Sequence, residues 1–203
     1  MKVTAVSTLS VDRFNYVKVE TDEDITGVGE LHPASGTGGT PFVPRAAVEY
    51  CAEYLVGKDP SHIERHWQHM FRRQLFRGGS DMMAAIGAID IALWDIKGKA
   101  LNKPVYELLG GPVREKVRLY THLGGNTPEA LAEEAAAKVE EGFTALRVYP
   151  FGDFGNSDFE EGLGLETMSF TGMQNNAIER IAAVREAAGP DTDIMIDVVN
   201  RLT

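Results

Sequence analysis

Three features that mark specialised classes of protein are scarce or missing in this sequence. Its 203 residues include one cysteine, Cys51, which excludes an intramolecular disulfide and indicates a reducing compartment. No apolar run is long enough to cross a bilayer, and the opening MKVTAVSTLSVDR is too polar for a signal peptide. The formal net charge is −10 and the sequence contains no basic stripe, which argues against nucleic acid as a partner. We therefore expect a cytoplasmic protein without a membrane or nucleic-acid partner.

The residues that are present predict an α+β first half. The composition is ordinary for a soluble globular protein, with 43% hydrophobic and 25% charged residues, and the length allows one large or two small domains. Residues 3–11 and 15–31 have the composition of strands, and the polar TDEDITG predicts the turn of a hairpin. A glycine-rich loop over 30–41 follows, and it contains His32.

Three helices are predicted next, over about 42–56, about 60–73, and from Ser80 onward. Ser80 is a suitable N-cap, and apolar residues at steps of three and four give the third helix one apolar face. Residues 102–104 end that helix, and a break follows at 110–112. The second helix carries three histidines at spacings of four and three, which we interpret as part of a solvated face: His62, His66 and His69.

After the break, strand and helix patterns alternate. Strands are predicted over 116–125, 143–151 and 192–199, and helices over about 127–141 and about 175–188. This alternation predicts parallel strands joined by right-handed crossovers.

Each of these strands has one apolar and one polar face, because side chains alternate along a strand. Such a pattern suits the inside of a parallel barrel, where functional groups collect at the C-terminal ends of the strands. Three strands leave an open doubly wound sheet as an alternative. The polar faces hold Arg118, Tyr120 and His122, then Arg147 and Tyr149, then Asp193, Met195 and Asp197.

The stretch AAIGAIDIALWDIKGKALNKPVYELLGG, residues 84–111, resembles the signature of the mandelate racemase and muconate lactonizing enzyme group of the enolase superfamily. THLGG, Arg147 and DVVNRLT resemble the corresponding strand ends of acid-sugar dehydratases of the mannonate and galactonate type. The resemblance implies an α+β N-terminal capping domain over 1–112. It also implies that 113–203 are the first strands and helices of a (β/α) TIM-type barrel. It further implies a homo-oligomer.

For function, the resemblance implies a Mg²⁺-dependent sugar-acid dehydratase. Such enzymes abstract a proton α to a carboxylate, and the divalent ion stabilises the resulting enediolate. The first metal ligand ends the third barrel strand, which is the position of Asp197. Arg147 and Tyr149 become candidate catalytic residues, the first for negative charge and the second for proton relay. His122 and His32 become candidate substrate contacts.

Each assignment has a structural alternative. Asp197 could cap a helix or solvate a loop, Arg147 could form a salt bridge in the barrel floor, and Tyr149 could be a packing residue. His122 could be a neutral histidine that lines the barrel, and His32 an ordinary surface histidine.

The sequence also departs from the family pattern. Arg147 and Tyr149 stand where many relatives have two lysines, which removes a lysine base because arginine does not readily give up a proton. Val199 stands where mannonate-type dehydratases place a histidine. A glycine-rich insertion over 152–176 could form a lid, with Phe159 or Glu166 projecting into the site.

A complete barrel has eight strands and typically about 250 residues, so we expect this chain to be part of a longer enzyme and to be inactive alone. A racemase or epimerase of the same superfamily is an alternative for the parent protein. A non-catalytic derivative of the fold is another.

Overall fold

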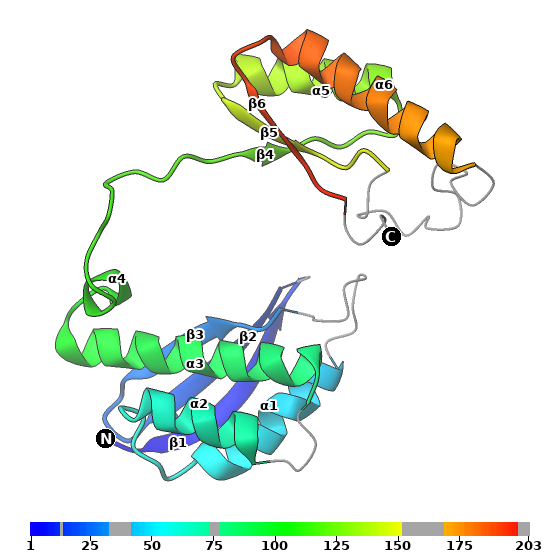
Figure 1. The fold of residues 1–203 in the computed structure, drawn as a ribbon. Helices are drawn as coiled ribbons and strands as arrows, with labels where there is room; N and C mark the ends of the chain where they lie inside the picture. The colour runs from blue at the N-terminus through cyan, green and yellow to red at the C-terminus, as the bar shows by residue number, and fades with distance from the viewer. Residues whose placement is uncertain (13, 33–41, 74–77, 152–168, 199–203) are drawn as a thin grey trace. The chain divides into compact units, whose positions relative to one another are not determined.

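The computed structural model describes residues 1–12, 14–32, 42–73, 78–151 and 169–198, and it is drawn in Figure 1. The chain divides into two compact units, Met1–Glu115 and Lys116–Thr203. Each unit has its own hydrophobic core, and each is described by itself.

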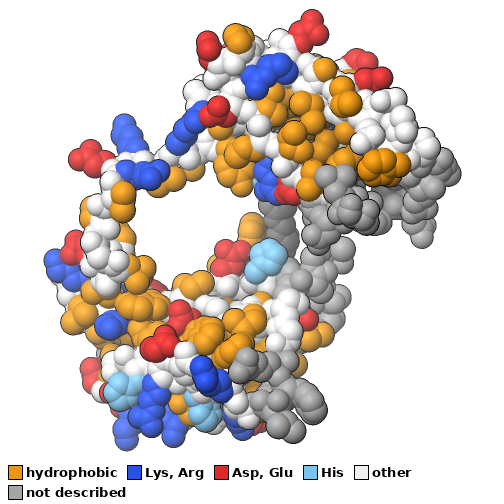
Figure 2. Space-filling model, viewed as in Figure 1, with side chains coloured by type: hydrophobic (Ala, Val, Ile, Leu, Met, Phe, Trp, Pro, Cys, Tyr) orange, Lys and Arg blue, Asp and Glu red, His pale blue; other side chains and the backbone are white. Residues whose placement is uncertain are grey.

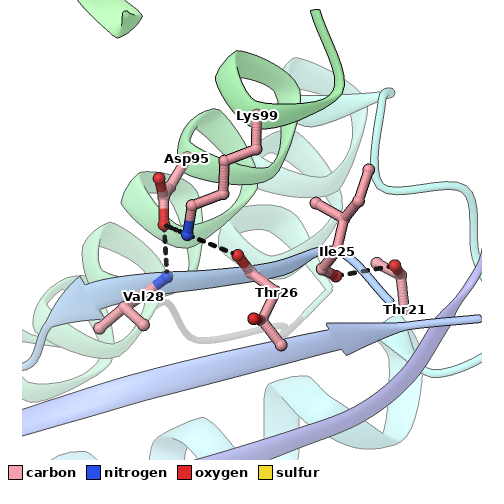
Figure 3. Close-up of polar contacts among 6 residues, drawn as sticks. All are labelled: Thr21, Ile25, Thr26, Val28, Asp95 and Lys99. Carbon is pink, nitrogen blue, oxygen red and sulfur yellow. Dashed lines mark hydrogen bonds and ion pairs between the residues drawn. The ribbon is translucent and has the colours of Figure 1, made fainter. Parts of the chain in front are cut away.

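The N-terminal unit begins with the predicted antiparallel strands, in the order β1-β2-β3. Buried and partly exposed residues alternate along β2, so one face of the sheet turns into the core. The turn after β2 is closed by the Thr21 hydroxyl, which donates to the Ile25 carbonyl at 2.7 Å (Figure 3). The strands are β1 (Val3–Val11), β2 (Phe14–Thr21) and β3 (Thr26–Glu30).

Helices pack against this sheet and form the core with it. The predicted helix positions are confirmed, with one correction at the start of the third: Gly79 is the N-cap and Ser80 is already helical, without a side-chain cap. Asn102 ends that helix in the left-handed conformation, with φ of 51°. The helices are α1 (Phe42–Leu55), α2 (Ile63–Arg72), α3 (Ser80–Leu101) and α4 (Val105–Leu108).

The interpretation of the α2 histidines as a solvated face is wrong for His66. Its side chain is 2% exposed and lies between α1 and the segment before α2. The Tyr54 hydroxyl and the Asp59 carbonyl satisfy both ring nitrogens of His66 and make its burial possible.

The contact between α3 and β3 depends on glycine. A Cβ on Gly27 would lie 1.9 Å from the Ala92 carbonyl oxygen, and one on Gly29 would lie 2.0 Å from that of Ala88. A carboxylate on α3 then fastens the strand edge: Asp95 accepts from the Val28 amide at 3.0 Å (Figure 3). Glycine thus lets the helix approach the backbone of the strand.

Lys99 completes this attachment one turn further along α3. Its ammonium donates to the Thr26 carbonyl at 2.7 Å and to the Asp95 carboxylate at 2.8 Å (Figure 3). The signature stretch in the sequence therefore has a structural task, which is to hold α3 on the sheet.

The C-terminal unit has three parallel strands, as predicted, and their order is β4-β5-β6. The strands are shorter than predicted, and β4 pairs with only two residues of β5, Leu146 and Arg147. The elements are β4 (Thr121–His122), α5 (Pro128–Glu140), β5 (Ala145–Val148), α6 (Phe170–Ala188) and β6 (Asp193–Ile196).

Both helices of this unit have capped starts. Thr127 caps α5 by accepting from the Ala130 amide. Ser169 caps α6 in the same way through the Gly172 amide. The predicted start of α6 near 175 is therefore wrong, and the last residues of the expected insertion are helical.

The core of this unit lies between the strands and the two helices. Leu146 and Val148 of β5 are fully buried and cluster with Leu131 of α5 and Val184 of α6. Arg147 lies between them in sequence, so its side chain points to the other face.

Across the described parts of both units, no helix is long and apolar enough to span a membrane.

Candidate active site

The register of the parallel sheet lines up three positions in a row. His122 of β4 pairs with Arg147 of β5, and Arg147 pairs with Met195 of β6. Beyond β6, the Asp197 amide donates to the Val148 carbonyl at 3.0 Å, so the ladder continues to that residue. The C-terminal ends of parallel strands meet at one edge, which brings the polar side chains of this row together.

Arg147 is the centre of the resulting cluster. One of its guanidinium nitrogens lies 2.9 Å from His122 Nε2, and the other forms an ion pair with the Asp197 carboxylate. The side chains of Arg147 and Asp197 are both 24% exposed, so the pair is partly shielded from water. A guanidinium only donates, so His122 Nε2 accepts and the proton of the neutral ring lies on Nδ1.

Tyr149 and Tyr120 place aromatic rings around this cluster. The Arg147 guanidinium lies 5.1 Å from the centre of the Tyr149 ring. The Tyr149 ring meets the His122 ring edge-on with centres 6.0 Å apart, and the Tyr120 ring stacks on the same histidine with centres 5.6 Å apart. Arg147 and Tyr149 therefore share one face at the strand ends, as the alternation of side chains predicts.

Arg180 of α6 supports this region, and sequence reasoning missed it. It is 1% exposed, and its guanidinium donates to the carbonyls of Gly125, Asn126 and Tyr149 at 2.8, 2.7 and 3.5 Å. The β4–α5 loop and the end of β5 are thus held by one buried cation. A charged residue on a helix ordinarily indicates a solvated position, so no local signal singles it out.

The remaining polar residues of the strands form a second cluster at the opposite, N-terminal ends. Arg118 pairs with Asp193 at 2.6 Å and donates to the Thr144 hydroxyl at 2.9 Å and carbonyl at 2.6 Å. Both charged side chains are exposed. The polar residues that the sequence assigns to one face therefore form two separate clusters. Arg147 belongs to the cluster at the C-terminal edge of the sheet.

The other candidates lie elsewhere. His32 is exposed on the N-terminal unit, directly after β3. Phe159, Glu166 and Val199 lie outside the described residues. Within the residues that the structure describes, no group of three or more His, Cys, Asp or Glu side chains is arranged to hold a metal ion.

Comparison with known proteins identifies the family. The mandelate racemase / muconate lactonizing enzyme N-terminal domain matches residues 2–110, and the enolase C-terminal domain-like family matches residues 130–203. The chain is 40% identical over 203 residues to a D-galactonate dehydratase of Xanthomonas oryzae pv. oryzae, covering 100% of this chain and 49% of that protein.

Solved structures give the same fold. A member of the enolase superfamily from Salmonella Typhimurium matches with a TM-score of 0.81 and 31% identity, covering 95% of this chain and 53% of that one. The 3,6-anhydro-D-galactonate cycloisomerase from Zobellia galactanivorans matches with a TM-score of 0.75 and 32% identity, covering 100% and 52%.

The α+β domain and the parallel βα units that follow it, together with the matched family models and solved structures, place this chain in the enolase superfamily. Within it, this chain belongs to the mandelate racemase / muconate lactonizing enzyme family. The predicted family and fold class are confirmed. The chain spans about half the length of the curated relatives that it matches.

Proposed function

We propose that the whole protein is a Mg²⁺-dependent dehydratase that removes water from a sugar acid after abstracting the proton α to its carboxylate. The observation that carries the proposal is the cluster of Arg147, Asp197, His122 and Tyr149 at the C-terminal edge of the parallel sheet. The 40% identity to a D-galactonate dehydratase supports the sugar-acid class of substrate.

Asp197 fits the chemistry of one Mg²⁺ ligand. It is a partly shielded carboxylate at the end of a parallel strand, and Mg²⁺ prefers carboxylate and water oxygens. A Mg²⁺ ion held by Asp197 would supply positive charge that stabilises the negative charge developing on a substrate carboxylate.

The residues of this chain have separate tasks in the proposal. The planar guanidinium of Arg147 can bind a carboxylate or a developing oxyanion through two hydrogen bonds. Before substrate binds, this guanidinium forms an ion pair with Asp197. Its own basicity excludes it as the proton acceptor. Tyr149 lies beside the guanidinium and can relay a proton, while His122 orients Arg147 and contacts substrate. His32 remains a proposed substrate contact.

A second candidate is a non-catalytic derivative of the fold, and the Arg147–Asp197 ion pair favours it. In such a protein the guanidinium supplies the positive charge that Asp197 otherwise receives from a metal ion. A racemase or epimerase of the same superfamily is a third candidate, because it begins with the same proton abstraction.

Turnover of a panel of sugar acids by the full-length protein, with and without Mg²⁺, distinguishes these functions. Asp197→Asn should lower metal affinity and reduce kcat/KM by about a hundredfold or more, on the scale of one preorganised electrostatic contact. Asp193→Asn is the matched control, because it changes a carboxylate of the same strand that pairs with Arg118 at the opposite end. Unchanged calorimetric Mg²⁺ binding in Asp197→Asn would contradict the proposed ligand.

Two further variants test the proposed catalytic pair. Arg147→Lys keeps the charge but loses the fork that reaches both His122 and Asp197, so kcat/KM should fall by about a hundredfold. Tyr149→Phe removes the hydroxyl proton and keeps the ring, so turnover should fall while the melting temperature stays within a few degrees. Normal turnover in both variants would mean that the pair is structural.

We also propose that the whole protein works as a homo-oligomer in the cytoplasm. The one cysteine among the 203 residues of this chain supports a reducing compartment, and the oligomeric state is carried over as an expectation from the family to which the chain belongs. Light scattering of the full-length protein measures the oligomeric state directly.

A further inference from the structure

A pocket of about 300 Å³ lies in the N-terminal unit, between the end of α1 and α2. Tyr54 of α1, Lys58 of the connecting segment, and Arg65 and His69 of α2 line it. Figure 2 shows histidine and basic side chains gathered along this edge of the unit. None of these residues takes part in the cluster around Arg147, so the pocket has no task in the proposed dehydration.

The wall of the pocket is fixed by hydrogen bonds. His66 Nε2 lies 2.7 Å from the Asp59 carbonyl oxygen, which accepts its proton, so Nδ1 accepts from the Tyr54 hydroxyl at 3.1 Å. Burial lowers the pKa of His66, in agreement with a neutral ring. The Tyr54 ring also stacks on His69 with centres 3.7 Å apart. The wall is therefore preorganised, and its shape does not depend on a ligand.

The lining carries more positive than negative charge. Lys58 and Arg65 are cations at neutral pH, and the Lys58 ammonium lies 5.7 Å from the centre of the Tyr54 ring. Desolvation lowers the pKa of His69, and the charges of Arg73, Lys58 and Arg65 lower it further.

Asp59 is the one carboxylate that lines the pocket among the described residues, and its oxygen already accepts from the Ser61 amide at 2.9 Å. That hydrogen bond lowers the pKa of Asp59. The carboxylate is therefore turned toward its own loop. It offsets only part of the charge of Lys58 and Arg65, and His62 adds a further donor to the lining.

We propose that this pocket binds a small multivalent anion of the phosphate class, either inorganic phosphate or a phosphate monoester. Arg65 and Lys58 supply charge-assisted hydrogen bonds to the phosphoryl oxygens, and His62 and His69 supply ring N–H donors. The stacked Tyr54–His69 pair forms one rigid side of the pocket.

The test is a titration of the ¹⁵N-labelled chain with sodium phosphate at pH 7, with ionic strength held constant by sodium chloride. We expect saturable shifts confined to the amides of 54–69, and none with chloride alone. Lys58→Gln and Arg65→Gln should each weaken binding about tenfold, on the scale of one charged hydrogen bond. Both side chains are exposed, so both variants should keep the wild-type spectrum elsewhere.

Arg72→Gln is the matched control, because Arg72 lies on the same helix but hydrogen-bonds Gln68 at 2.7 Å instead of lining the pocket. It should bind phosphate as the wild type does. Methyl phosphate separates the two sources: equal or tighter binding indicates a monoester, and weaker binding indicates the inorganic ion. Shifts that do not saturate, or an equal loss in Arg72→Gln, would overturn the proposal.

Discussion

At the residue scale, His66 and Arg180 are buried polar side chains that are stabilised by hydrogen bonds to nearby groups of the fold. His66 is held neutral between a carbonyl and a hydroxyl, and Arg180 is surrounded by carbonyls. Burying either side chain without those partners would cost several kcal/mol. Both therefore give predictions that depend on one side chain.

The depressed pKa of His66 makes stability depend on pH. The unfolded chain takes up a proton near the ordinary histidine pKa of about 6.5, whereas the folded chain resists it. Folding stability that is present above that pH is therefore lost as the pH falls below it. We expect the melting temperature of the wild type to drop between pH 7.5 and pH 5.5. His66→Gln cannot take up this proton, so its melting temperature should start lower and vary less over the same range. Equal slopes for both proteins in differential scanning calorimetry would contradict the prediction.

Arg180→Met should destabilise the C-terminal unit by about 3 kcal/mol, because it leaves the Gly125 and Asn126 carbonyls without their buried donor. Arg185→Met is the control on the same helix. Arg185 also donates to carbonyls, those of Gly189 and Thr192, but it is exposed and water can replace it. Its removal should cost about 1 kcal/mol or less. Urea unfolding monitored by NMR signals of β5 measures both values, and similar losses would show that burial is not the cause.

The sequence predicts only those site residues whose side-chain direction follows from the alternation of side chains along a strand. Arg147 and Tyr149 share a face because they are two residues apart along the chain. Asp197 lies near Arg147 because the parallel register of β5 and β6 sets which residues lie side by side. Arg180 comes from a helix and meets the strand ends through tertiary packing. Its role could not be read from spacing, since helical charges normally face water.

At the scale of elements, α3 and β3 form a joint in which small residues on both sides allow close approach. The sequence predicts α3 from its apolar spacing and places Gly27 and Gly29 in the strand pattern over 15–31, which the structure confirms. The reason for glycine at these two positions is visible only in the contact, where the backbone of Ala88 and Ala92 of α3 occupies the space of the missing side chains. Local propensity disfavours glycine in a strand, so tertiary packing decides here.

A pair of glycine-to-alanine changes tests this joint, with opposite signs expected. Gly29→Ala places a methyl group 2.0 Å from a backbone oxygen, which only a shift of the helix can relieve, and should destabilise the N-terminal unit by about 3 kcal/mol. Gly87→Ala, inside α3, has nothing within 4 Å and should stabilise by about 0.5 to 1 kcal/mol through helix propensity. Chemical denaturation gives both values. A stabilising Gly29→Ala would show that the contact is loose.

At the scale of the whole molecule, the two units differ in how much apolar surface they bury. The described core of the N-terminal unit holds seventeen buried residues, centred on α3 and β2, whereas that of the C-terminal unit holds seven. Large apolar residues of β6, Met195 and Ile196, are exposed in the second unit. Each buried aliphatic side chain contributes about 1.5 to 3 kcal/mol, so the difference in core size should appear as a difference in stability.

We therefore predict that the two units of this chain open separately, and that the C-terminal one opens first. In native-state hydrogen exchange, amides of α3 and β2 should be the slowest, and amides of β5 and β6 should exchange at least about a hundredfold faster, which corresponds to about 2.7 kcal/mol. Leu93 and Val19 are suitable reporters for the first core, and Leu146 and Ile194 for the second, because each lies in or against its hydrophobic cluster. Adding urea should expose the second set at a lower concentration than the first. A single set of exchange rates in both units, moving together with urea, would mean that the chain unfolds as one cooperative body in spite of its two cores.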